Sequence, residues 1–251
     1  MTKPFIIWTM RRTGGTSFAN LLELVTESKV EHEPFNWERT FGFITKEFQT
    51  KNLDIQYLEE NLQDYCFSKN QCIKHCYEVV GDSFNQHLIE AFAQENYKHI
   101  VLIRRNELLR LISLYTAKQT NVWGKHGSEK VYEAYKEGKH SLRAYDTTEM
   151  KSHWISCQEQ TSLIRTLLGE HKIDFAELYY EDLYSGTYEE RVAKFKEVFD
   201  YLETPTKDIE NKLTEGKYLF MKAKQNTDQL YRLIPNLEEI KEAFPQYPIE
   251  V

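Results

Sequence analysis

Basic residues, glycines and hydroxyl side chains lie together near the start of the sequence, between two apolar segments. Residues 5–8 are typical of a buried parallel strand, and residues 18–25 carry apolar side chains at the i, i+3, i+4 and i+7 positions of a helix. A strand, a glycine turn and a helix can bind an oxyanion, because the first N–H groups of the helix are unpaired and its dipole is positive there. We therefore predict an anion cradle formed by Arg11, Arg12, Thr13, Gly14, Gly15, Thr16 and Ser17.

The cradle differs from a nucleoside-triphosphate P-loop, which requires the pattern G-x-x-x-x-G-K-[ST]. If Gly14 is aligned with the second glycine, Gly15 occupies the lysine position and Thr9 the position of the first glycine. The positive charge lies upstream, at Arg12. The sequence thus still predicts phosphate binding but argues against an ATP or GTP site, and a glycine turn without a ligand is the structural alternative.

A second group of polar residues follows the apolar run of residues 99–103. Arg104 and Arg105 follow this run, so Arg105 stands at the expected strand end. Ser113 lies about two turns into the next helix, which Asn106 is suited to cap. A guanidinium and a hydroxyl are the donors that hold a phosphate monoester well. Spacing alone does not establish that the two side chains converge on one ligand.

These two motifs resemble those of sulfotransferases that use 3′-phosphoadenosine-5′-phosphosulfate (PAPS). Residues 12–16 are similar to the R-[ST]-G-[ST]-T loop that binds the 5′-phosphosulfate, and Arg105 with Ser113 to the Arg-x7-Ser pair that binds the 3′-phosphate. Residues 104–123 resemble the corresponding run of bacterial sulfotransferases of the trehalose and glycolipid type. The sequence departs from the family at Gly15, where a hydroxyl residue is usual. The resemblance implies PAPS as donor, 3′,5′-ADP as product, no metal, and a homodimer.

Three further segments match the family more loosely. Residues 180–183, Tyr-Glu-Asp-Leu, resemble a stretch that follows the fifth strand in many sulfotransferases, where a capped helix start is the simpler interpretation. Lys224 lies in a segment, 222–226, that resembles the late loop closing over the nucleotide. Residues 32–36 resemble the segment that carries a catalytic glutamate in carbohydrate sulfotransferases. The resemblance thus makes Arg12 and Glu33 the candidate catalytic residues, and the alternative bases are His32, His75, His126 and His153.

Composition limits the classes of partner. The 251 residues are 41% hydrophobic and carry a formal net charge of −7, whereas a general nucleic-acid binder usually has a basic face. The cations are clustered instead, which favours a small anionic ligand. No apolar run is long enough for a transmembrane helix, and no signal peptide precedes the first strand. Four scattered cysteines then favour a reduced, cytoplasmic protein.

Apolar runs and helical periodicities alternate along the chain. This alternation predicts an α/β fold with a central parallel sheet of about five strands, and the resemblance makes it a P-loop-NTPase-like fold of three layers. In such sheets ligands bind beyond the carboxyl ends of the strands. We expect a single domain over residues 1–251, with a polar, irregular lid or acceptor segment at about 121–150. Aromatic residues there and nearby can stack on sugars: Trp123, Tyr132, Tyr135 and Trp154.

The sequence therefore predicts a PAPS-dependent sulfotransferase that modifies a hydroxyl of a glycan, a glycolipid or a small molecule. Two alternatives stay open. A P-loop kinase acting on a small molecule is disfavoured by the missing loop lysine and by the lack of a clear Mg²⁺ carboxylate. A catalytically silent nucleotide-binding module would keep the cradle and lack a working base.

Overall fold

The computed structural model describes residues 2–50, 54–124, 128–205, 208–221 and 227–249. Its centre is a sheet of five parallel strands in the order β2-β3-β1-β4-β5. This confirms the predicted α/β class and parallel sheet, and it is consistent with a three-layer, P-loop-like fold. The strands are β1 (Phe5–Thr9), β2 (Val30–His32), β3 (Cys72–Cys76), β4 (Lys98–Ile103) and β5 (Phe175–Tyr179).

The chain packs as two compact units. The first consists of Met1–Ile103 and Glu159–Ala223 and contains the whole sheet, and the second consists of Arg104–Gln158 and Lys224–Val251. The long helix α7 (Thr147–Glu170) is divided between them after Gln158. The single domain predicted from the sequence stays a prediction.

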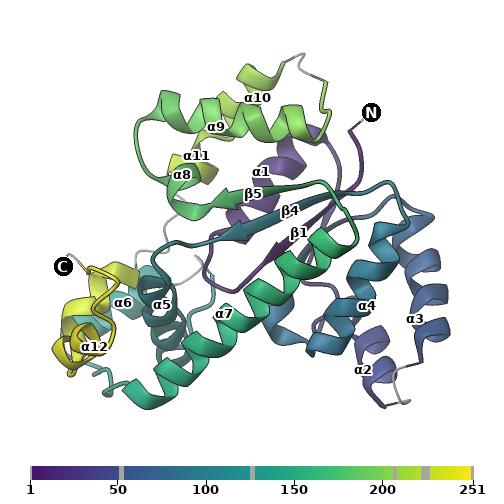
Figure 1. The fold of residues 1–251 in the computed structure, drawn as a ribbon. Helices are drawn as coiled ribbons and strands as arrows, with labels where there is room; N and C mark the ends of the chain where they lie inside the picture. The colour runs from purple at the N-terminus through teal and green to yellow at the C-terminus, as the bar shows by residue number, and fades with distance from the viewer. Residues whose placement is uncertain (1, 51–53, 125–127, 206–207, 222–226, 250–251) are drawn as a thin grey trace. The chain divides into compact units, whose positions relative to one another are not determined.

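Strand β1 lies in the middle of the sheet because every one of its residues is apolar or readily buried. Phe5, Ile6, Ile7, Trp8 and Thr9 are all 0% exposed. The strand pairs with β3 on one side and with β4 on the other. Figure 1 shows β4 between β1 and β5. The two edge strands differ from it: β2 is short and β5 is only half-buried.

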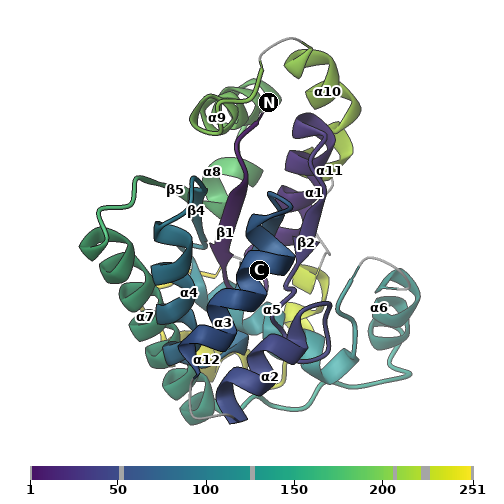
Figure 2. The same cartoon turned by 90° about the vertical axis from the view of Figure 1, so that its right-hand side faces the viewer.

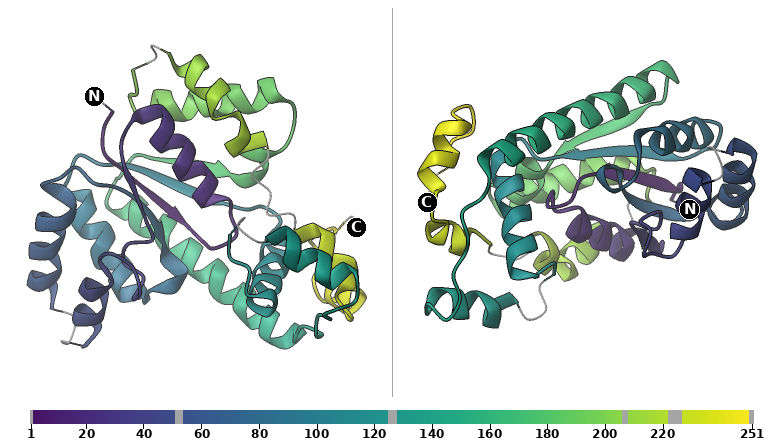
Figure 3. Two further views of the ribbon diagram at one scale, coloured as in Figure 1. Left: turned by 180° about the vertical axis from the view of Figure 1, so that it is seen from behind. Right: turned by 90° about the horizontal axis from the view of Figure 1, so that it is seen from below.

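One face of the sheet is covered by α1 (Gly15–Thr26) together with helices from the later part of the first unit (Figure 3). These are α8 (Tyr180–Tyr184), α9 (Tyr188–Tyr201), α10 (Ile209–Glu215) and α11 (Lys217–Met221). The apolar side of α1 predicted from periodicity faces this layer, since its members Phe18, Leu21, Leu22 and Val25 are buried. The start of α9 is fixed by a capping box between Thr187 and Glu190.

The other face is covered by α4 (Asp82–Ala93) and the C-terminal part of α7, with α2 (Gly42–Thr50) and α3 (Ile55–Leu62) beside α4 (Figure 2). Helix α3 continues as a π-helical turn, Gln63–Phe67, and β3 continues as a 3₁₀ turn, Tyr77–Val79. On this face Trp8 packs edge-on against His75, with ring centroids 5.3 Å apart. Trp8 also donates from Nε1 to Nδ1 of His99 over 3.2 Å.

The second unit is a small helical cluster with its own core. It contains α5 (Glu107–Thr120), α6 (Ser128–Lys136), the start of α7, a 3₁₀ segment η3 (Thr227–Leu233) and α12 (Leu237–Ala243). Helix α5 begins where predicted, because Oδ1 of Asn106 accepts from the N–H of Leu109 over 3.0 Å. The core joins residues of all these elements, among them Leu111, Tyr132, Tyr145, Leu230 and Ile240.

The expectation of an irregular segment at 121–150 is wrong in part. Residues 128–136 form α6, and Tyr132, Leu142, Tyr145 and Met150 are buried. Polar residues dominate this stretch, but their spacing leaves an apolar side that packs in the second unit. Its role as a lid or acceptor segment stays a prediction.

The five predicted strands are confirmed, and the sequence missed the helices α2, α10 and α11. Among the described residues, none of the helices combines the length and the apolar composition needed to cross a bilayer. The four cysteines are free thiols in buried positions: Cys66, Cys72, Cys76 and Cys157.

Candidate functional site

The predicted anion cradle lies where β1 ends and α1 begins, in the first unit. Arg12 and Gly14 both adopt left-handed backbone conformations, with φ of 68° and 77°. Helix α1 starts at Gly15, and Gly14 provides no side-chain cap for it. The first intrahelical bond runs from the N–H of Phe18 to the carbonyl of Gly14 over 3.1 Å. The N–H groups of the first turn thus point out of the helix end, as binding of an anion requires.

The inside of the loop is fixed by buried hydroxyl groups. Thr13 is 2% exposed, and its Oγ1 donates to the carbonyl of Met10 and contacts Oγ1 of Thr9. Oγ1 of Thr9 also donates to the carbonyl of Leu102 on β4, over 3.1 Å. Thr13 therefore shapes the loop from within, and its hydroxyl is occupied by these contacts within the loop.

Two tyrosines of α8 cover the loop at Gly14. The hydroxyl of Tyr184 donates to the carbonyl of Gly14 over 3.1 Å, and its ring lies beside that of Tyr180, tilted by 37° with 4.9 Å between centroids. A Cβ added at Gly14 would lie 2.8 Å from the Tyr184 ring and 2.9 Å from the Tyr180 ring. Residues 180–183 thus begin a helix and pack on the cradle, in line with the simpler interpretation of that motif.

A buried lysine from β3 completes the cradle, and the sequence analysis missed it. Lys74 is on the face of the sheet that α1 covers, and its side chain is 5% exposed. Its Nζ lies 3.5 Å from Oγ1 of Thr16, and its Cε lies 3.4 Å from where a Cβ of Gly15 would be. An ammonium group from the neighbouring strand therefore lies at the position where the loop itself lacks a lysine. The available signal was a lysine inside an otherwise buried strand, which is rare without a partner.

The partner of Lys74 is Glu33, the predicted base. Nζ of Lys74 donates to Oε1 of Glu33, and the backbone N–H of Glu33 bonds to the carbonyl of Lys74 over 2.7 Å. Glu33 has a left-handed backbone with φ of 53°, a conformation that non-glycine residues adopt at a cost. The structure thus brings Glu33 to the cradle through Lys74.

The electrostatics of Glu33 reflect two opposing causes. Burial raises the pKa of its carboxyl, but the charge and hydrogen bond of Lys74, with the charges of Arg39 and Arg11, lower it below the usual value. His32 next to it is also affected, because burial and then the charge of Lys74 lower its pKa. Both groups are therefore held in their basic forms at neutral pH, with Glu33 charged and His32 neutral.

Arg11 contacts a carboxylate as well. Its backbone N–H and its Nε both donate to Oε1 of Glu78, which follows β3 in the 3₁₀ turn. The side chain of Glu78 is 2% exposed. The carboxylates of Glu33 and Glu78 near the cradle thus each contact a cation, an arrangement unlike the open carboxylate that Mg²⁺ binding uses.

The other candidate bases are less well placed. His75 is 1% exposed, bonds to Oδ1 of Asn85 over 2.8 Å, and has its pKa lowered by burial to about 4. It is best described as a core residue. His153 is in the second unit, 6.0 Å from the ring of Tyr115. His126 lies outside the described residues, as does Lys224.

Arg105 and Ser113 belong to the second unit. Arg105 is exposed and precedes the Asn106 cap of α5, and Ser113 is buried on the same helix, 3% exposed. The predicted helix and its cap are confirmed, while the joint role of the two residues stays a prediction. Of the aromatic residues named for sugar stacking, Tyr132 is buried, Trp154 donates to the hydroxyl of Tyr247 over 3.2 Å, and Trp123 is exposed.

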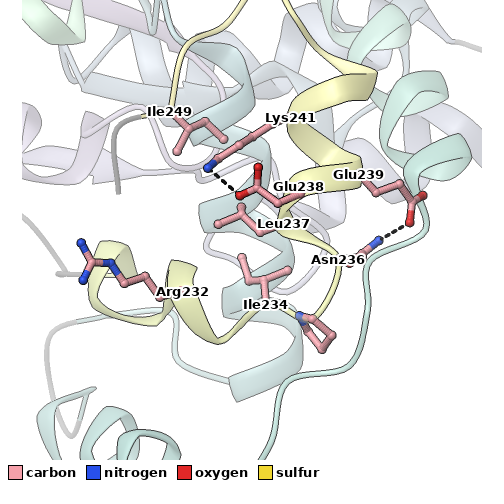
Figure 4. Close-up of a pocket in the computed structure, with 9 residues that line it drawn as sticks. Arg232, Ile234, Asn236, Leu237, Glu238, Glu239, Lys241 and Ile249 are labelled. Carbon is pink, nitrogen blue, oxygen red and sulfur yellow. Dashed lines mark hydrogen bonds and ion pairs between the residues drawn. The ribbon is translucent and has the colours of Figure 1, made fainter.

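A hollow of about 770 Å³ lies in the second unit (Figure 4). Its carboxylates are engaged: Glu238 pairs with Lys241 over 2.8 Å, and Glu239 accepts from Thr147 over 2.7 Å. None of the predicted site residues lines it, and we assign it no chemistry. Its walls are formed by Arg232, Ile234, Pro235, Asn236, Leu237, Glu238, Glu239, Lys241 and Ile249.

In comparisons with models of known protein families and with curated proteins, this chain matched none.

Proposed function

We propose that this protein is a sulfotransferase that moves a sulfuryl group from PAPS to a hydroxyl of a glycan, a glycolipid or a small molecule. The observation that carries the proposal is the cradle itself, in which the first turn of α1 and the ammonium of Lys74 face one small volume beside Glu33. Cations and N–H groups for an anion thus stand next to a carboxylate that can accept a proton.

The residues present fit the 5′-phosphosulfate end of PAPS. Gly15 has no side chain, and a Cβ there would lie 3.1 Å from Cγ2 of Thr9 and 3.4 Å from Cε of Lys74. The absent side chain lets Thr9 and the stem of Lys74 pack directly against the start of α1, which keeps the lysine beside the helix end. PAPS would supply the sulfuryl group. Its 5′-phosphate would carry the negative charge that Arg12 and Lys74 are proposed to bind, and its 3′-phosphate the charge that Arg105 is proposed to bind.

Each residue then has a distinct task. Transfer of this kind is an in-line displacement, which positioning and charge stabilisation dominate. Arg12, Lys74 and the N–H groups of residues 15–17 would stabilise charge on the 5′-phosphate side. Glu33 would take the proton of the attacking hydroxyl. Arg105 and Ser113 would bind the 3′-phosphate.

The kinase alternative has less support. Mg²⁺ binding at a nucleoside triphosphate needs carboxylates that are open to the ion, but Glu78 is bonded to Arg11 and Glu33 to Lys74. A silent nucleotide-binding module shares the cradle and differs only in lacking transfer. Binding and transfer must therefore be measured separately.

The binding experiment compares the thermal shifts caused by 3′,5′-ADP, ADP and ATP with Mg²⁺. A ligand at ~100 times its dissociation constant adds about 2.7 kcal/mol of stability. We expect the largest shift for 3′,5′-ADP, and Arg105→Ala should remove its advantage over ADP. Arg143→Ala, at another exposed arginine of the second unit, is the matched control. Equal shifts for the two diphosphates in the wild-type protein would contradict the proposal.

The transfer experiment follows labelled sulfate from PAPS to a panel of sugar and small-molecule alcohols in the presence of EDTA. We expect transfer to at least one acceptor class without a divalent metal. Tight binding of 3′,5′-ADP without any transfer across the panel would favour the silent module. A requirement for Mg²⁺ and ATP would favour the kinase.

A further inference from the structure

Lys74 lies between the carboxylate of Glu33 and the first turn of α1, where an anion is proposed to bind. Its nearly buried ammonium donates to Oε1 of Glu33 and reaches Oγ1 of Thr16, 3.5 Å away, in the first turn of α1. Thr16 and Gly15 belong to the helix end where an oxyanion would bind. One ammonium carries a single charge, so it cannot fully neutralise both the carboxylate and the bound anion.

We propose that an anion entering the cradle draws Lys74 away from Glu33, and that this exchange converts Glu33 from an ion-pair partner into a proton acceptor. The inference rests on the proposed function and adds an order of events to it: the donor binds first, and only then is the base active. The lysine thereby couples occupancy of the cradle to the basicity of the carboxylate.

The surroundings of Glu33 explain why its contact with Lys74 has a large effect on the pKa of its carboxyl. The charged and titratable groups that interact with it are Lys74, His75 and Cys76 from β3, Arg11 from the loop after β1, and Arg39 and His32 from its own segment. Arg11 is already bonded to Glu78. Burial disfavours the charged carboxylate, and Lys74 is the largest influence that opposes burial. When Lys74 turns to an anion, burial is left to raise the proton affinity of Glu33.

The movement of Lys74 also places its positive charge beside the 5′-phosphate, where negative charge develops in the reaction. As the acceptor oxygen forms its bond to sulfur, the bond from sulfur to the bridging oxygen of the 5′-phosphate breaks. The acceptor proton passes to a carboxylate oxygen of Glu33, and the electron pair of the broken bond stays on the phosphate. Lys74, now beside the phosphate, stabilises that charge. Without a donor, Lys74 stays on Glu33 and an acceptor hydroxyl meets a weak base.

Inorganic sulfate is a suitable probe, because it does not itself titrate at the pH of the experiment. Isothermal titration at about pH 5.5, in two buffers of different ionisation enthalpy, measures the protons taken up on binding. We expect proton uptake by the wild-type protein. Glu33→Gln should abolish this uptake and bind sulfate several-fold more tightly, since its Lys74 is released. Lys74→Met should bind sulfate at least ~10-fold more weakly.

Glu31→Gln is the matched control, because Glu31 lies in the edge strand β2, two residues before Glu33, and forms an ion pair with Lys29 over 2.5 Å. It should alter neither affinity nor uptake. Sulfate binding without proton uptake, or unchanged affinity in Glu33→Gln, would overturn the exchange and leave the proposed function intact. If neither sulfate nor 3′,5′-ADP binds the wild-type protein, the cradle itself is wrong, and the proposed function fails with it.

Discussion

Arg11 and Glu78 join the loop after β1 to the end of β3, through a bond of 2.9 Å between Nε and Oε1 and a second one from the backbone N–H of Arg11. The carboxylate is almost fully buried, while the Arg11 side chain is 31% exposed. The two adjacent arginines look equivalent in the sequence, but Arg12 has a left-handed backbone conformation and Arg11 does not. Arg11 braces the cradle, and Arg12, in a left-handed conformation at its rim, is the better candidate for the ligand.

This difference predicts opposite results for two alanine variants. Arg11→Ala should lower the free energy of unfolding by roughly 1–3 kcal/mol, because it removes the cation from a buried carboxylate. Arg12→Ala should keep the stability and lower kcat by ~10²–10³, the usual loss for a donor to the transition state. Urea denaturation and turnover of PAPS check the two parts. Equal loss of turnover in both variants, with no change in stability, would contradict the division of roles.

The close approach of the tyrosines to Gly14 predicts a strong effect of a single methyl group. Gly14→Ala should be destabilised by more than the ~1–2 kcal/mol that a left-handed alanine costs, because its Cβ would also collide with Tyr180 and Tyr184. Gly138→Ala is the matched control, since Gly138 has φ of 74° and no atom within 4 Å of an added Cβ. Urea denaturation measures both. Similar losses of stability in the two variants would mean that Tyr180 and Tyr184 move aside for the added Cβ without a measurable loss of stability.

An exposed tryptophan close to Glu33 predicts where the acceptor lies. Trp37 is 47% exposed on the loop that a bond from Phe41 N–H to the Pro34 carbonyl closes, and Nζ of Lys46 lies 5.9 Å from its ring centroid. An aromatic contact is worth about 0.5–1.5 kcal/mol, so Trp37→Ala should raise KM for the acceptor by ~3–10-fold.

Affinity of the Trp37→Ala variant for 3′,5′-ADP should not change, as fluorescence or calorimetry can determine. Trp123→Ala is the comparison, because Trp123 is equally exposed, at 49%, in the second unit. A raised KM in Trp123→Ala alone would instead favour the segment at 121–150 as the acceptor site.

Buried histidines predict a loss of stability in mild acid. Burial lowers the pKa of His75 and of His99 to about 4, against about 6.5 in an unfolded chain. The unfolded chain binds protons that the folded protein excludes, so the stability present above about pH 6.5 is lost as the pH falls toward 4. The loss in the free energy of unfolding is at most roughly 3 kcal/mol for each histidine.

Melting temperatures between pH 7 and about pH 4.5 test this expectation. A variant with both His75→Gln and His99→Gln should be less stable at neutral pH and show a flatter dependence on pH. His140→Gln, at an exposed position, should follow the wild-type curve. An unchanged slope in the double variant would assign the acid sensitivity to other groups.

The sequence predicted the sheet well because its strands are buried. Residues 5–8 and 100–103 are apolar without interruption, a pattern typical of a parallel strand covered on both faces. Helix α6 was missed because its apolar side is formed by Val131, Tyr132 and Tyr135 among charged residues, and tyrosine gives a weak periodic signal.

The cradle was predicted from local sequence, since a turn and the helix after it are adjacent in the chain. Lys74 was missed because it reaches the cradle across the sheet, through the pairing of β1 with β3. A motif within one segment contains no information on such a contact. Glu33 was placed from resemblance alone, and its ion pair depends on the register that sets His32 opposite Lys74.

The order of the strands also has a consequence for synthesis of the chain. Ile6 pairs with Ile73 on one side and His99 on the other, and the helices that cover α1 come after residue 159. Pairings between segments so distant along the chain form slowly. Strand β1 is therefore made well before its partner strands, which are complete only at residue 103, and before the helices on the α1 side of the sheet. It is the segment at which we would expect chaperones to bind the nascent chain, and aggregation to start if they do not.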